Sequence, residues 1–129
     1  MTRIPDLPLL REALEWAEAE AAKPAGDRQW NQKYYRLTPD QAPLFGHPKV
    51  PACGTTYCLF GWVCYLAGEE WASPMNGARL AGDGHVFDRA ADLLGLDIDT
   101  ANRLSHFTNT IDDLRRIAEE IAASVGETL

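Results

Sequence analysis

Residues 56–67 read TYCLFGWVCYLA, a stretch in which apolar side chains occupy almost every position. The pattern predicts a helix over Thr56–Ala67 that is apolar on nearly all sides, with Gly68 as its C-terminal stop. A helix without a polar face is buried among other elements rather than lying on the surface. We therefore expect this helix at the centre of a small bundle.

Amphipathic patterns flank this stretch on both sides. The helices expected from them cover about Leu7–Ala22, Phe87–Leu94, Thr100–Phe107 and a last segment that starts near Thr110. Their caps and stops are Asp6 for the first, Gly95 after the second and Asp97 or Asp99 before the third, and the buried stripe of the last is Ile111, Leu114, Ala118, Ile121 and Val125. The expected fold is mostly α: a single domain over residues 1–129 that forms a bundle of four to five helices.

One long segment, residues 24–52, has no helical pattern. It contains five of the eight prolines, together with Trp30, Tyr34, Tyr35 and Phe45. Proline removes a backbone donor and favours extended backbone before it, so we expect an ordered loop here, with room for a short strand or hairpin around Tyr34–Leu37. Long loops inside small domains tend to be functional, and the search for a site begins here.

The charge distribution bears on the kind of partner. The net charge is −7, with seven basic and seven acidic residues in positions 1–65 but five basic and twelve acidic residues in positions 66–129. A domain that binds duplex nucleic acid concentrates basic residues on one face, so we expect a protein partner and no direct contact with nucleic acid.

No apolar run suits a membrane span and no export signal opens the chain, so we expect a cytoplasmic protein. Nothing in the sequence determines the oligomeric state.

Three cysteines, Cys53, Cys58 and Cys64, lie in or near the apolar stretch. With His47 and His85 they suggest a zinc site, but the spacing lacks the two close pairs of a structural site. An odd number of cysteines without an export signal indicates reduced thiols. We expect them to fill the core, with no metal, no cofactor and no catalytic residue; an enzyme or metal site built on these thiols remains the alternative.

The run from Cys53 to Trp62, CGTTYCLFGW, and the later run AADLLGL at residues 90–96 resemble a family of small proteins from actinobacteria and their phages. Members share a Cys-Gly-Thr-x-x-Cys-x-x-Gly-Trp core and an Ala-x-x-Leu-Leu-Gly-Leu helix end. The resemblance covers about residues 30–107. The resemblance implies an origin in an actinobacterium or one of its phages, but it does not imply any particular activity.

Within the proline-rich segment, Gln41-Ala42-Pro43-Leu44-Phe45 resembles the Gln-x-x-Leu-Phe peptide with which polymerases and repair proteins bind the bacterial β sliding clamp. The resemblance implies that Gln41 forms hydrogen bonds at the mouth of an apolar cleft, whereas Leu44 and Phe45 fill its pockets. Pro43 restricts the backbone and so reduces the entropy lost on docking. The preferred hypothesis is a non-enzymatic, phage-encoded inhibitor that binds the host clamp through Gln41–Phe45 and blocks DNA replication.

Two other hypotheses remain open. The acidic second half suits an interaction protein, or a DNA mimic, that acts on another host protein. Residues 86–107 also resemble a helix-turn-helix, although Asp88, Asp92, Asp97 and Asp99 outnumber Arg89 and Arg103 on the two helices. The packing of Leu44 and Phe45 in the protein's own core is the structural alternative to the clamp motif.

Overall fold

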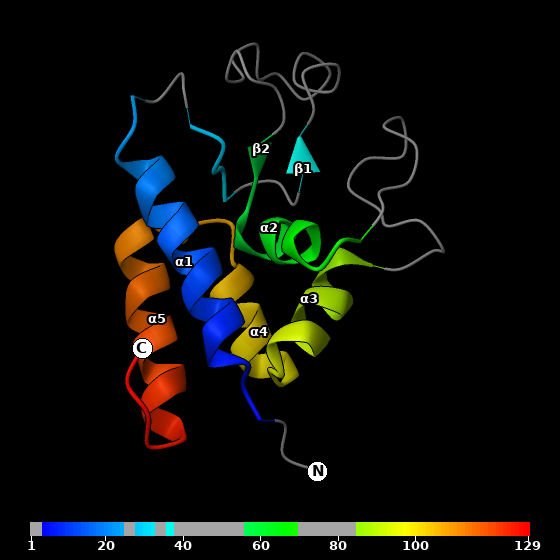
Figure 1. Ribbon diagram of the computed structural model, residues 1–129, viewed down its shortest axis with the longest axis vertical. Helices are drawn as coiled ribbons and strands as arrows, with labels where there is room; N and C mark the ends of the chain where they lie inside the picture. Colours follow the sequence, from blue (N-terminus) through cyan, green and yellow to red (C-terminus); the bar gives the residue numbers. More distant parts are fainter. Residues whose placement is uncertain (1–3, 25–27, 33–35, 38–55, 70–84) are drawn as a thin grey trace.

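Five helices and one two-stranded antiparallel ladder make up the part of the chain described by the computed structural model, which comprises residues 4–24, 28–32, 36–37, 56–69 and 85–129 (Figure 1). In chain order the elements are α1 (Leu7–Ala21), β1 (Arg36–Leu37), β2 (Thr56–Tyr57), α2 (Leu59–Leu66), α3 (Val86–Leu94), α4 (Ile98–Ser105) and α5 (Ile111–Ser124). The prediction of a mostly α bundle with four to five helices is confirmed.

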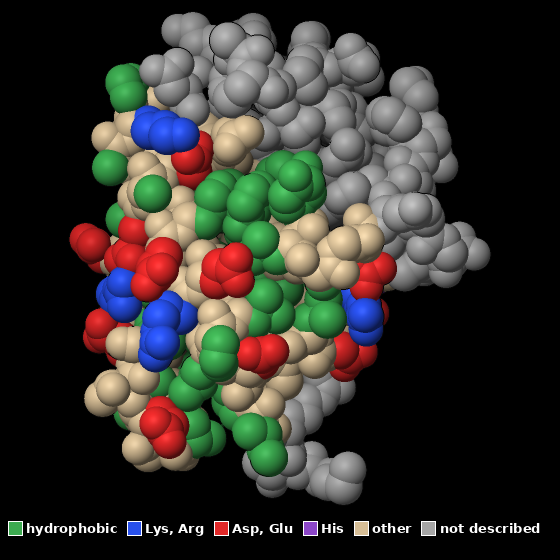
Figure 2. All heavy atoms as spheres, viewed as in Figure 1, with side chains coloured by type: hydrophobic (Ala, Val, Ile, Leu, Met, Phe, Trp, Pro, Cys, Tyr) green, Lys and Arg blue, Asp and Glu red, His purple; other side chains and the backbone are tan. Residues whose placement is uncertain are grey.

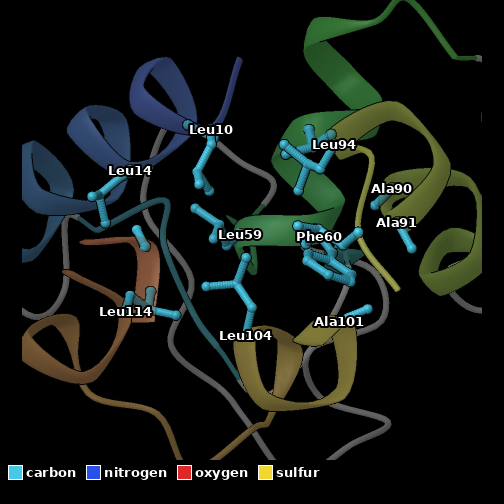
Figure 3. Close-up of a cluster of buried hydrophobic side chains, with 14 of the residues drawn as sticks. Leu10, Leu14, Leu59, Phe60, Ala90, Ala91, Leu94, Ala101, Leu104 and Leu114 are labelled. Carbon is cyan, nitrogen blue, oxygen red and sulfur yellow. The ribbon is translucent and has the colours of Figure 1, made fainter. Parts of the chain in front are cut away.

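Helix α2 supplies the centre of the core, as its apolar sequence predicts. Leu59, Phe60, Val63 and Cys64 have no exposed surface. Figure 3 shows the surrounding side chains, which come from the other four helices: Leu10 and Leu14 of α1, Ala90, Ala91 and Leu94 of α3, Ala101 and Leu104 of α4, and Leu114 of α5. Burial of these side chains is the main stabilising term for the bundle.

The start of the central helix differs from the prediction. The helix begins at Leu59, not at Thr56, because Thr56 and Tyr57 pair with Leu37 and Arg36 as strand β2. Threonine and tyrosine both favour extended backbone, and the partner strand supplies the hydrogen bonds that a helix would otherwise provide. Cys58 is therefore the N-cap, where its Sγ accepts from the Gly61 N–H at 3.4 Å.

Local capping signals determine the other helix ends closely. Asp6 caps α1 and Thr110 caps α5, each through a side-chain oxygen that accepts a backbone N–H three residues on. Helix α4 starts at Ile98, two residues before the predicted Thr100, because Asp97 is its cap: Asp97 Oδ1 accepts from the Thr100 N–H at 2.8 Å.

The predicted buried stripe of the last helix is correct in its middle and wrong at its end. Leu114, Ala118 and Ile121 are buried, and Ile117 joins them. Val125 is 44% exposed because α5 ends at Ser124, so the chain turns away before Val125 can face the core.

Among the described residues, no helix is long and apolar enough to cross a membrane.

Candidate functional site

The predicted binding residues Gln41, Pro43, Leu44 and Phe45 all lie outside the residues that the structure describes. The structure does describe the two strands on either side of the segment that contains them. Leu37 pairs with Thr56, and Arg36 pairs with Tyr57, in an antiparallel register. The chain therefore leaves the described structure at Leu37 and re-enters it at Thr56, the residue paired with it.

The anchor of this strand pair is Tyr57. Its backbone N–H donates to the Gln29 carbonyl at 2.7 Å, and its own carbonyl accepts from the Asn31 N–H at 2.8 Å. These two bonds form a parallel bridge with Trp30 on the side of β2 opposite to β1. The predicted strand within Tyr34–Leu37 is thus present at Arg36–Leu37, but its partner is distant in sequence and not a tight hairpin arm.

A buried amide holds residues 28–32 against the helices. Gln32 is only 6% exposed. Its Oε1 accepts from the Leu59 N–H at 3.3 Å and from Trp30 Nε1 at 3.2 Å, while its Nε2 donates to the carbonyls of Leu104 (3.2 Å) and His106 (3.4 Å). One side chain therefore joins the segment before β1, the first turn of α2 and the C-terminal end of α4.

Beside the strand pair lies a cluster of aromatic rings, Trp16, Tyr57, Trp62 and Tyr65, which we call the aromatic patch. Trp16 stacks on Trp62 with ring centroids 4.2 Å apart and planes 4° from parallel. Trp62 also stacks on Tyr65, at 4.7 Å and 20°, and Tyr57 meets Trp62 edge-on at 5.6 Å. Offset-stacked and edge-to-face contacts of this kind add to the stabilisation from burial.

The aromatic patch opens to the surface. Tyr65 is 51% exposed, and Trp16 and Trp62 are half-buried. Figure 2 shows hydrophobic side chains gathered on this face, over α2 and the adjoining part of α1. Trp16 Nε1 is buried and has no hydrogen-bond partner among the described residues, so stacking rather than hydrogen bonding holds this ring in place.

The two described cysteines belong to the core. Cys58 and Cys64 are buried, and Cys64 Sγ lies 3.9 Å from the Val86 carbonyl, to which it donates. Burial raises the pKa of each thiol to about 12, which keeps both protonated and poorly nucleophilic at neutral pH. Cys53 and His47 lie in ranges that are not described, whereas His85 caps α3. Within the described ranges, no group of three or more His, Cys, Asp or Glu could hold a metal ion.

A concave feature lies at the opposite end of the bundle from the strand pair (Figure 1). A hollow of about 630 Å³ is lined by residues of α4 and of the C-terminal half of α5, with Pro5 and Leu96 in its wall. The Arg103 guanidinium and the Glu120 carboxylate both line this hollow, and their pairing lowers the pKa of Glu120. These two charges neutralise each other, so this pair offers neither a free anion nor a free cation to a ligand.

The α3–α4 corner has the connectivity predicted for a helix-turn-helix, but its charges are those of an ordinary helix pair. Residues 95–97 join the two helices, and Gly95 adopts the left-handed conformation. Arg89 pairs with Glu69, and Arg103 pairs with Glu120, so both arginines of the corner are already neutralised. To contact a phosphate, each arginine would have to leave its carboxylate partner.

No protein-family model, curated protein or solved structure matches the chain. Inference about function therefore rests on the residues themselves. Trp30 belongs to the segment in which the sequence predicts a site, and it lies beside β2, whereas Trp16 and Gln32 were not predicted from the sequence. The signal for Trp16 was its position next to Leu14 and Ala17, at the edge of the buried stripe of α1.

Proposed function

We propose that the protein is a non-enzymatic binding module that presents Gln41–Phe45 to the bacterial β sliding clamp and thereby inhibits DNA replication. The clamp cleft would take Leu44 and Phe45 in its apolar pockets, with Gln41 bonded at its mouth. Occupying this cleft would exclude a replicative polymerase that uses the same type of peptide. The sequence motif is the basis of this proposal.

The observation that carries the proposal furthest is the pairing of Leu37 with Thr56. A peptide whose two ends are held beside each other samples fewer conformations than a free tail, so it loses less entropy when it docks. The backbone of Tyr57 bonds β2 to Gln29 and Asn31, and Gln32 in turn bonds that segment to α2 and α4. The binding peptide would therefore be tethered at both ends to a stable scaffold.

Energetic considerations set the expected affinity. A single peptide of this length should bind at about micromolar strength, which corresponds to roughly −8 kcal/mol. Each apolar anchor contributes roughly 1.5–3 kcal/mol through burial. The removal of Leu44 and Phe45 together should then weaken binding at least about a hundredfold, beyond the reach of a sizing experiment.

Co-elution of the purified protein with a bacterial β clamp on a sizing column tests the proposal. The wild-type chain should co-elute, and the double variant Leu44→Ala plus Phe45→Ala should not. Phe107→Ala is the matched control, because Phe107 is an exposed aromatic (59% exposed) that follows the C-cap of α4. Co-elution that survives the double variant would contradict the proposal, and co-elution lost in moderate salt would favour the acidic-mimic hypothesis instead.

A further inference from the structure

Strand β2 lies between two other extended segments. It pairs with β1 on one side, and on the other side the Tyr57 backbone bonds to Gln29 and Asn31. Strand β2 continues through Cys58 into α2, so the chain itself holds this strand to the bundle. Residues 28–32 are held to the bundle by hydrogen bonds from side chains.

Two buried side chains supply these hydrogen bonds. Glu20, in the last turn of α1, accepts from the Gln29 N–H at 2.7 Å. Gln32 accepts from one backbone N–H of α2 and donates to two carbonyls at the C-terminal end of α4. Glu20 thus holds the start of this segment, and Gln32 holds its end, shortly before β1 begins at Arg36.

We propose that Gln32 is a positioning residue for the peptide that binds the clamp, an inference that rests on the proposed function. Its amide fixes residues 28–32 against α2 and α4, these residues bond β2, and β2 pairs with β1. The two strands directly flank residues 38–55, which contain Gln41–Phe45. Gln32 would therefore act on clamp affinity through the ends of this segment, without contact with the clamp.

The size of the effect follows from loop entropy. While the strands are paired, residues 38–55 are the segment between fixed ends. If the strand pair and Gln32 release, the nearest fixed points are Gln29, which Glu20 holds, and Cys58, the N-cap of α2. The free segment then covers residues 30–57, and the number of conformations that docking must suppress rises about two- to threefold. Clamp affinity should fall by the same factor.

Surface plasmon resonance of the full chain on an immobilised β clamp tests the proposal. Compared with the wild-type chain, Gln32→Ala should bind with a dissociation constant about two- to threefold higher. Ile121→Ala is the matched control, because it truncates a buried side chain beside the hollow and lowers stability at the opposite end of the bundle from the strand pair. Urea unfolding sets conditions in which every chain is folded, and there Ile121→Ala should bind like the wild-type chain.

Hydrogen exchange gives a readout that does not require the clamp. The Tyr57 N–H, which bonds the Gln29 carbonyl, should exchange about tenfold faster in Gln32→Ala than in Ile121→Ala, because only Gln32→Ala releases the segment locally. Trp30→Phe removes only the Nε1 donor to Gln32 Oε1. This variant should give a smaller rise in the same direction, and it replaces Gln32→Ala in both measurements if that variant does not fold.

The outcomes separate this proposal from the clamp function. Equal exchange at Tyr57 in Gln32→Ala and Ile121→Ala, or equal clamp affinity of Gln32→Ala and the wild-type chain, would overturn the role of Gln32 while the clamp function stands. No binding by the wild-type chain would overturn the proposed function, and the role of Gln32 in binding with it.

Discussion

Gln32 is one of two buried polar or charged residues, with Glu20, in the part of the chain that the structure describes. Its amide makes four hydrogen bonds, to three parts of the chain, from a position that is 6% exposed. This role of Gln32 could not be predicted from the sequence, because its partners Leu59, Leu104 and His106 lie far from it along the chain. A glutamine in a polar loop has no local signature of burial.

Replacement of Gln32 by alanine should destabilise the fold by about 2–4 kcal/mol, since it leaves the buried Leu59 N–H and Leu104 carbonyl with fewer partners. Urea unfolding followed by circular dichroism measures the loss. Asn102→Ala, at an exposed amide of α4, should change stability by less than about 0.5 kcal/mol. Equal effects of the two substitutions would show that Gln32 does not join these segments.

The thiols of Cys58 and Cys64 should resist alkylation in the native protein. Burial raises the pKa of each to about 12, so their thiolate fractions at pH 8 are about 10³-fold below that of an exposed cysteine. Because the folded pKa lies above the unfolded value of 9.0, their contribution to stability is complete below pH 9 and is lost as the pH rises toward 12.

Iodoacetamide labelling with peptide mass spectrometry measures this protection. Both cysteines should remain unmodified in buffer and become modified in urea. Rapid native labelling of Cys58 would contradict its place in the core.

At the scale of the elements, helix ends were predictable because their signals are local. Asp6 and Thr110 cap the helices that directly follow them, and Gly95 ends α3 with a left-handed conformation. The start of α2 was not predictable in the same way. Residues Thr56–Tyr57 form a strand only because Arg36–Leu37 lies beside them, and no local pattern encodes that pairing.

Gly95→Ala should be one of the most damaging small substitutions in the chain. Gly95 has a φ of +69°, and a Cβ there would lie 2.1 Å from the Ile4 carbonyl oxygen. The cost of the backbone conformation, about 1–2 kcal/mol, therefore adds to a clash with backbone. Gly68→Ala is the matched control, because Gly68 has a similar φ of +78° and a Cβ there would meet no atom of the described residues within 4 Å.

Thermal unfolding of the two glycine variants separates the two costs. Gly68→Ala should show only the conformational penalty, and Gly95→Ala should be clearly less stable than Gly68→Ala. Equal melting temperatures would mean that the segment around Ile4 does not press on the α3–α4 turn.

The cap of α5 gives the protein an acid-sensitive element. The Thr110 N–H donates to the Asp113 carboxylate at 3.0 Å, and this hydrogen bond lowers the pKa of Asp113. A depressed folded pKa means that the contribution of this group to stability is present above about pH 4 and is lost as the pH falls further. Asp113→Asn should thus lower stability at pH 7 and flatten the pH dependence below pH 4, as measured by urea unfolding across pH 2–7. If the free energy of unfolding of Asp113→Asn falls below pH 4 as steeply as that of the wild-type chain, Asp113 does not have this role.

At the scale of the whole molecule, the apolar stretch at residues 56–67 was sufficient to predict a bundle with this segment in its core. The amphipathic helices α1 and α3–α5 cover the face of α2 that carries Leu59, Phe60, Val63 and Cys64, whereas Tyr65 of α2 stays 51% exposed, contrary to the expectation of a helix buried on all sides. The surface features were harder to predict from the sequence. The stack of Trp16 on Trp62 joins two helices whose relative position depends on the packing of the entire core. The proposed clamp motif, in contrast, is a local pattern, and the proposal rests on the sequence alone.

The most direct test of the central claim is a displacement measurement on the β clamp itself. A fluorescent Gln-x-x-Leu-Phe peptide is bound to the clamp, and fluorescence anisotropy is followed as the intact protein is added. We predict that the wild-type chain displaces the peptide at about micromolar concentration. Failure of the wild-type chain to displace it, or equal displacement by the Leu44→Ala plus Phe45→Ala variant, would contradict the account.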